Sequence, residues 1–251
     1  ELEAGSFSYF GTVDYDYDSK YGFAGSFRRD ASYRFVDDNK WGTFWSVAGR
    51  WNISKEDFLQ DNSIITDLKL RASYGTTGNQ NIQARGNDDS QSTIFYQATA
   101  VRDLNSSQTG YANAASFGVS SYANTALKWE TVAQFNVGID FKIVNRLSGS
   151  FDYYNKHTTD LFQDIPISSA NGLTTISANS GALRNSGFEL NLRYDVLKDS
   201  KFKFSVFANG AFNKNEITDL GNLENGTGQV RVGTDFVNAI GGPAFQYFLV
   251  P

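Results

Sequence analysis

The segment Asp67–Ile82, DLKLRASYGTTGNQNI, changes character in its middle. The first half alternates between two kinds of side chain, with apolar residues at every second position: Leu68, Leu70, Ala72 and Tyr74. The second half is glycine, threonine, asparagine and glutamine, which are poor material for a hydrophobic core. Because side chains of a β-strand point alternately to two faces, the first half predicts a strand with one apolar and one polar face. The fold class depends on what covers each face.

The same alternation recurs along most of the chain. In QFNVGIDFKI (Gln134–Ile143) and GFELNLRYDV (Gly187–Val196), polar residues separate apolar ones with almost no exception. Counting such segments predicts about eight antiparallel strands. They fall near Gly5–Tyr17, Tyr21–Asp30, Trp41–Ile53, Leu68–Tyr74, Gln134–Ile143, Leu147–Tyr154, Gly187–Val196 and Lys201–Asn213.

The expected connections differ between the two ends of the strands. At one end they are short turns, near Asp18–Lys20, Ser54–Thr66, Val144–Arg146 and Leu197–Ser200. At the other end they are long and polar: Ala31–Lys40, Gly78–Leu127, Thr158–Ala182 and the segment from Glu216 onward. This asymmetry is typical of outer-membrane β-barrels, whose short turns are periplasmic and whose long loops are extracellular. In the second short turn, SKEDFL predicts a single helical turn with Ser54 as its N-cap.

Composition narrows the classes of function. The chain has 251 residues and a formal net charge of -5, with no basic cluster that could neutralise the phosphates of a nucleic acid. The absence of cysteine excludes disulfides, thiolate catalysis and cysteine metal sites. No apolar run of about 18 residues is present, so a transmembrane helix is not expected. Aromatic residues make up 15% of the chain, an excess that suits the aromatic girdles of a transmembrane barrel.

A soluble β-sandwich would show similar alternation and is the main alternative to a membrane barrel. The expected strands favour the barrel because they are about ten residues or longer, the length of a tilted bilayer crossing. Aromatic residues also recur near strand ends, where interfacial girdles lie. These residues are Tyr15, Tyr17, Tyr21, Phe23, Trp41, Trp51, Tyr74, Tyr153, Tyr154 and Tyr194.

Several stretches carry a more specific signal because of their order along the chain. They are SFRRDASYRFVDDNKWGTFWSVAGRWNISKEDFL (Ser26–Leu59), LKLRASYGTTGNQNI (Leu68–Ile82), LKWETVAQFNVGIDF (Leu127–Phe141), RLSGSFDYYNKHTTDLF (Arg146–Phe162) and NSGALRNSGFELNL (Asn179–Leu192). Together they resemble the C-terminal barrel region of SusC/RagA-like TonB-dependent outer-membrane transporters. The resemblance covers most of Ser26–Asn213, and its most characteristic part is the segment that begins at Leu68.

The resemblance implies an all-β, antiparallel transmembrane barrel of about 22 strands in the bacterial outer membrane. Residues 1–251 are then expected to be a fragment of the barrel domain, without the plug domain and the closing strands. It implies import of an oligosaccharide or peptide, with TonB and a SusD-like surface lipoprotein lid as partners. The bilayer and its lipopolysaccharide would surround the barrel, and neither a cofactor nor enzymatic activity is expected.

Charged residues on the polar faces of the strands are expected to line the lumen. They are Arg50, Lys69, Arg71, Asp140, Asp152, Glu189 and Arg193. One interpretation is that they pair across strands and hold the plug, and the other is that some of them contact the substrate. The first is favoured, because transporters that resemble this chain bind substrate nearer the outer mouth.

The long loop Gly78–Leu127 is the predicted place for contacts with substrate or lid. Its candidates are Tyr96, Arg102, Tyr111 and Tyr122, set among amide and hydroxyl residues. Aromatic rings flanked by amide and charged groups suit sugar rings and also peptides. The alternative, which is favoured over substrate contact, is that this loop packs against neighbouring loops or the lid.

No catalytic or metal-binding constellation is visible in the sequence. The single histidine, His157, has no nucleophilic serine or acidic partner at a telling spacing and is expected near the membrane rim, after a strand. Asp14, Asp16 and Asp18 alternate at a strand end but lack the glycine and final glutamate of a calcium loop. They are expected to face the lumen or a turn.

Two other classes of function stay open. A barrel of this kind could be a structural or interaction protein, as partner or cargo of an envelope secretion machine. A soluble sugar-binding β-sandwich is the third possibility. Heat-modifiable migration in detergent gels separates a barrel from a sandwich.

Overall fold

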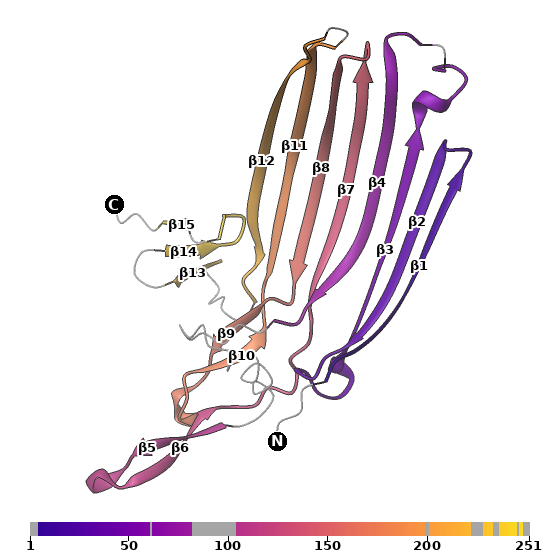
Figure 1. Cartoon of the computed structure of the whole chain (residues 1–251). Helices are drawn as coiled ribbons and strands as arrows, with labels where there is room; N and C mark the ends of the chain where they lie inside the picture. Colours follow the sequence, from indigo (N-terminus) through magenta and orange to yellow (C-terminus); the bar gives the residue numbers. More distant parts are fainter. Residues whose placement is uncertain are drawn as a thin grey trace.

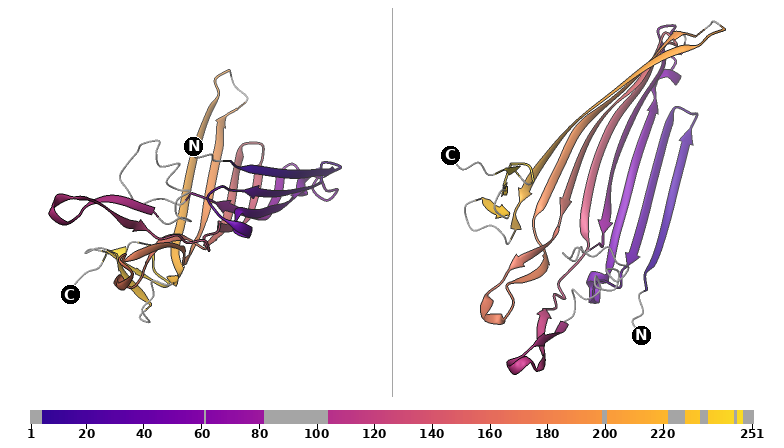
Figure 2. Two further views of the ribbon diagram at one scale, coloured as in Figure 1. Left: turned by 90° about the horizontal axis from the view of Figure 1, so that it is seen from below. Right: turned by 60° about the vertical axis from the view of Figure 1, so that its left-hand side comes forward.

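The protein is built around one large curved sheet (Figures 1 and 2). The structure, a computed structural model, describes residues 5–60, 62–81, 104–198, 201–221, 228–232, 236–244 and 246–247. Eight antiparallel strands pair in the order β1-β2-β3-β4-β7-β8-β11-β12. Their bounds are β1 Phe7–Tyr17, β2 Tyr21–Ala31, β3 Trp41–Asn52, β4 Ile65–Asn79, β7 Glu130–Ile143, β8 Leu147–Thr159, β11 Ala182–Leu197 and β12 Phe204–Asp219. The predicted all-β antiparallel fold is confirmed.

Smaller elements lie at the end of the sheet that carries the long connections (Figure 1). They are the hairpin β5–β6 (Leu104–Thr109 and Ala115–Ser121), the hairpin β9–β10 (Phe162–Pro166 and Thr175–Asn179), and the strands β13 (Gln229–Val232), β14 (Phe236–Ala239) and β15 (Gln246–Tyr247). Short 3₁₀ turns occur at η1 Asp37–Lys40, η2 Ile53–Lys55, η4 Tyr111–Asn113 and η5 Ser169–Asn171. Within the described ranges, no helix has the length and apolar character needed to cross a membrane.

The strand register gives the sheet two distinct faces. One row across β4, β7, β8 and β11 consists of Leu70, Ile139, Phe151 and Leu190. The face that carries this row is called the apolar face, and the opposite one the polar face. Side chains of the apolar face are largely uncovered, with Phe212 65% exposed. No second large sheet packs on this face in the described part of the chain, which argues against the sandwich. An apolar face of this size fits lipid rather than water.

The strands run further toward the long-connection end than the alternation predicted. β8 continues to Thr159 instead of ending at Tyr154, and β12 continues to Asp219 instead of Asn213. β4 includes the segment GTTGN and ends at Asn79, whereas the predicted strand ended at Tyr74 and the predicted long connection began at Gly78. The prediction failed there because hydropathy alternation marks only the part of a strand whose outer face is apolar, whereas backbone pairing continues past it.

The turn between β3 and β4 is anchored by a carboxylate. The predicted N-cap at Ser54 is wrong, because η2 has no side-chain cap and the Ser54 hydroxyl instead donates to Asp67 at 3.2 Å. Glu56 Oε1 accepts hydrogen bonds from the Tyr21 hydroxyl at 2.6 Å and from the Trp51 indole N–H at 3.0 Å. These hydrogen bonds lower the pKa of the Glu56 carboxyl. The turn is thereby tied to the aromatic residues at the strand ends.

This anchoring is expected to weaken in acid. Because the folded-state pKa of Glu56 is depressed, its contribution to stability is present above its ordinary value of 4.5 and is lost as pH falls through the lower folded value. Glu56→Gln should remove this pH dependence and increase hydrogen exchange of the turn at neutral pH. Asp57→Asn is a suitable control, because the Asp57 side chain is 95% exposed. Equal exchange in Glu56→Gln and the wild type would contradict the anchor.

A charge on the apolar face is expected to oppose membrane insertion. In the full-length protein, Ile139→Lys places an ammonium in the lipid-facing row and should cost about 2–4 kcal/mol of stability in a bilayer. Asn136→Lys, on the polar face of the same strand, is the matched control and should cost far less. The free energy of unfolding from lipid vesicles measures both, and similar losses would contradict the assignment of the faces.

Candidate functional site

The polar face carries a row of charges at mid-height of the sheet. The register aligns Asp16, Gly22, Arg50, Arg71, Gly138, Asp152 and Glu189 across seven neighbouring strands. Arg71 binds Asp140 through two hydrogen bonds of 2.9 Å and Asp152 through another of 2.9 Å. Lys69 lies 3.7 Å from the same Asp140 carboxylate. Bidentate arginine–carboxylate pairs are stronger than simple ion pairs, so this row braces the wall.

Two glycines allow these arginines to lie flat against the wall. Arg71 in β4 crosses Gly138 in β7 to reach Asp152 in β8, and a Cβ at Gly138 would lie 2.9 Å from Arg71 Nη2. Arg50 in β3 crosses Gly22 in β2 in the other direction to reach Asp16 in β1. Each arginine therefore spans three strands.

The charged residues predicted to line the lumen share one face of the sheet but differ in their ion-pair partners. All seven lie on the polar face, and five of them pair across strands: Arg50, Lys69, Arg71, Asp140 and Asp152. Arg193 instead binds Asp195 of its own strand at 3.0 Å. Glu189, opposite Asp152, has no ion-pair partner among the residues that the structure describes. Cross-strand pairing thus accounts for most of these charges.

A hydrophobic cluster closes the long-connection end of the wall. It consists of Phe35, Phe44, Leu127 and Trp129, with Phe35 and Leu127 fully buried. The Trp129 indole N–H donates to the Lys40 carbonyl at 3.1 Å. These residues, called the rim cluster, join the β2–β3 connection to the segment before β7.

Polar contacts reinforce the rim cluster. Glu130 is buried and accepts from the Phe162 N–H at 2.7 Å and from the Asn79 amide at 2.5 Å. The Asn179 side chain exchanges hydrogen bonds of 2.8 and 2.9 Å with the backbone of Lys128. The stretches LKWE and NSGA therefore hold the rim together.

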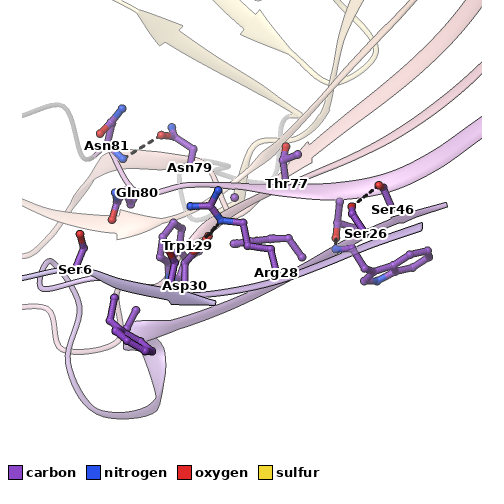
Figure 3. Close-up of a pocket in the computed structure, with 17 residues that line it drawn as sticks. Ser6, Ser26, Arg28, Asp30, Ser46, Thr77, Asn79, Gln80, Asn81 and Trp129 are labelled. Atoms are coloured by element: carbon purple, nitrogen blue, oxygen red, sulfur yellow. Dashed lines mark hydrogen bonds and ion pairs between the residues drawn. The ribbon is translucent and has the colours of Figure 1, made fainter. Parts of the chain in front are cut away.

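Beside the rim cluster lies a recess of about 530 Å³ on the polar face (Figure 3). One wall carries the Arg28–Asp30 ion pair and the hydrogen-bonded pair Ser26–Ser46. The other wall is the end of β4 and the residues after it: Thr76, Thr77, Gly78, Asn79, Gln80 and Asn81. Most of the polar half of the opening segment, Thr76–Asn81, thus forms one wall of this recess.

Two buried polar atoms at the recess lack partners within the described residues. The Gln80 amide oxygen, in the recess wall, accepts no hydrogen bond. Arg34 is 9% exposed, donates through Nη1 to the Gln80 carbonyl at 3.2 Å and to Asn81 Oδ1 at 2.8 Å, and its Nε has no acceptor. Buried unpaired polar atoms are uncommon, so the two beside this recess distinguish it from the rest of the wall.

The predicted loop residues do not assemble into one site. Tyr96 and Arg102 lie outside the described residues. Tyr111 is at the tip of the β5–β6 hairpin and 96% exposed, whereas Tyr122 follows the last residue of β6. The two tyrosines are at opposite ends of that strand, so the structure does not bring them together.

His157 and Asp16, also considered in the sequence analysis, contact other residues of the sheet and its turns. His157 lies within β8 rather than after it, on the apolar face, and its Nε2 is 3.3 Å from the Thr218 hydroxyl. Asp16 binds Arg50 and accepts from the Ser19 N–H at 2.9 Å. In the described part of the chain, no three His, Cys, Asp or Glu residues are grouped to hold a metal ion.

Comparison with known proteins agrees with this architecture. Residues 2–246 match the family described as TonB dependent receptor-like, beta-barrel. The chain belongs to this family. It is 36% identical over 214 residues to TonB-dependent receptor P3 of Formosa agariphila and 34% identical over 215 residues to TonB-dependent receptor SusC of Bacteroides thetaiotaomicron. Both alignments cover 85% of this chain but only 20% and 21% of those proteins.

A solved structure extends the agreement to three dimensions. The RagAB peptide importer in its closed-closed state superposes with a TM-score of 0.80 and 29% identity, over 96% of this chain and 25% of that one. The chain is therefore part of a SusC-like TonB-dependent transporter barrel, and it spans about a quarter of that importer chain. These relatives are receptors and transporters rather than enzymes.

Sequence reasoning missed the recess and the rim cluster. Phe35, Phe44 and Trp129 stand in segments where alternation is broken, and only tertiary contacts bring them together. The one available signal was their position inside the family-like stretches beginning at Ser26 and Leu127.

Replacing Gly138 is expected to disturb the charged row. In Gly138→Ala the new methyl group meets both the Asp152 carboxylate and Arg71, and should destabilise the protein by about 1–3 kcal/mol. Gly49→Ala is the control, in β3 on the other side of β4, because nothing lies within 4 Å of its Cβ position. Urea unfolding of the full-length protein in detergent micelles compares them, and equal stabilities would refute the crossing.

Proposed function

We propose that the protein takes up a large nutrient, an oligosaccharide or a peptide, across the outer membrane, driven through TonB and covered by a SusD-like lipoprotein. The observation that carries this proposal is the superposition of the whole sheet on the barrel of a peptide importer. The two unlike faces of the sheet support it as well, because a transporter wall needs lipid contact on one side and a polar interior on the other.

The charged row is assigned to the inside of the wall, facing a plug domain. Arg50 and Arg71 have their charges satisfied within the wall and brace it. Glu189 is exposed and without an ion-pair partner among the described residues, so it is available to a cation of the plug. The charged row therefore stabilises the wall and contacts the plug, and substrate contacts are assigned to the outer end.

The recess at the outer end is assigned to the substrate path. It combines hydroxyl and amide side chains with the face of Trp129, groups that suit the hydroxyls of a sugar or the amides of a peptide. Gln80 lines the recess, and its amide can hydrogen-bond either kind of substrate once the side chain turns its buried oxygen toward the recess.

Uptake by the bacterium that carries the gene tests the proposal. Deletion of the full-length gene should abolish growth on one oligosaccharide or peptide class, and a protonophore should abolish uptake of the labelled compound in the wild type. Unchanged uptake across both classes, with loss of a secreted protein from the surface, would favour the interaction barrel instead.

Substitution of Gln80 should weaken uptake specifically. Losing one hydrogen bond of about 1 kcal/mol should raise the concentration for half-maximal uptake about five-fold in Gln80→Ala. Gln134→Ala is the control, because Gln134 lies on the polar face outside the recess and contacts Asn136. Equal uptake by the two variants would remove Gln80 from the substrate path.

A further inference from the structure

The apolar face changes character near the long-connection end. The last apolar row across β8, β11 and β12 consists of Tyr153, Phe188 and Phe212. The next two rows are polar or charged: Asn155, Ser186 and Lys214, then His157, Arg184 and Glu216. These strands therefore continue past the apolar belt while the backbone ladder stays intact, which places the two polar rows at the level of lipid headgroups.

Basic residues on the apolar face are confined to this end. Among the described strand positions of that face they are Arg29, Arg184 and Lys214, called the basic band. At the short-turn end, the same face carries aromatic residues such as Tyr21 and Trp51. The charge on this face is thus polarised along the strands.

Arg29 is held in place without using its hydrogen-bond donors. Its guanidinium carbon lies 4.9 Å from the centroid of the Trp41 ring, and the Tyr9 ring is 6.1 Å from that ring. Stacking on an aromatic face fixes a guanidinium and leaves its N–H groups free at its edge. No hydrogen bond or ion pair of Arg29 occurs within the described residues. Arg29 is therefore a preorganised donor at the rim of the apolar belt.

Arg184 and Lys214 form the other part of the band, on adjacent strands. Lys214 lies 2.8 Å from Glu216, and Glu216 is opposite Arg184 in the register. Arg184 has no carboxylate within 4 Å in the described part of the chain, and its side chain is exposed. Three positive charges against one negative charge leave the band with an excess of two.

We infer that the basic band binds the phosphate groups of lipid headgroups in the outer leaflet, those of lipopolysaccharide. The inference rests on the proposed function, which orients the long-connection end outward. Charge complementarity carries it, because cations outnumber carboxylates on the lipid-facing side of this end, and the arginine fork matches phosphate geometry. At the opposite end, Lys20 and Lys198 lie beside the turns and bind groups of the protein itself: Glu56 and the Asn145 carbonyl.

Lipid retention by the full-length transporter tests the inference. The protein is placed in phosphatidylcholine nanodiscs that contain either bisphosphorylated lipid A or the same lipid without phosphates, and bound lipid is counted by native mass spectrometry. Arg184→Gln with Lys214→Gln should retain on the order of tenfold less bisphosphorylated lipid. Arg29→Gln should lose a smaller part. Glu216→Gln should retain more, because it removes the only negative charge in the two rows.

Controls separate the band from general effects of charge. Arg193→Gln and Lys142→Gln remove cations from the polar face and should leave lipid retention unchanged. Equal retention of the two forms of lipid A, or displacement of the lipid by inorganic phosphate, would overturn the inference. Heat-modifiable migration and uptake are measured first for every variant. If the variants fold and transport but retain as much lipid as the wild type, this inference alone is wrong. If the wild type shows neither heat-modifiable migration nor uptake, the proposed function is wrong.

Discussion

The large sheet of this protein faces lipid on one side and a polar interior on the other, and its backbone hydrogen bonds must be made within the sheet. Hydrocarbon offers no hydrogen-bond partners, so each backbone N–H and C=O inside the membrane must be paired within the wall. Eight antiparallel strands meet this requirement over most of their length; the exceptions are the free edges of β1 and β12 and the outer ends of β3 and β4, which pair with each other only as far as Ser46 and Gly75. In a bilayer these edges need neighbouring strands to pair with. The sheet is accordingly a section of a barrel wall that needs further strands at both edges.

The two faces then follow from the same register. Because a strand alternates its side chains, satisfying lipid on one face leaves every other position for the interior. The interior positions carry charges that would destabilise the wall if they were unpaired. Arginines that cross a glycine of the neighbouring strand pair with interior carboxylates. Gly22 and Gly138 matter for the room they leave above the backbone rather than for flexibility. Because these arginines lie flat, the polar face keeps a shallow pocket between Arg50 and Arg71, lined also by Ala48 and Ser73.

Much of this was predictable from the sequence, and the failures have physical causes. Alternation and turn composition located all eight long strands, because burial in lipid enforces the period of two. Alternation could not locate the outer strand ends, since beyond Tyr153 and Phe188 the pairing is retained but the apolar requirement is not. Ser54 resembled a helix cap only locally, and the turn is fixed instead by Glu56, whose partners lie in other strands. The rim cluster and the recess depend on long-range contacts that no local pattern encodes.

The two halves of the segment that begins at Asp67 therefore differ because of height in the membrane, since β4 itself continues unbroken as far as Asn79. From Leu68 to Tyr74 the outward side chains meet lipid, so they must be apolar. From Thr76 to Asn79 the same strand has left the apolar belt; its residues line the recess, and Asn79 donates to Glu130. Small side chains are needed there, since a Cβ at Gly78 would collide with the Phe44 ring of the rim cluster. A segment that looks like a strand running into a loop is mostly a single strand that continues past the apolar belt, and this continuation places the polar residues where the proposed function has a substrate enter.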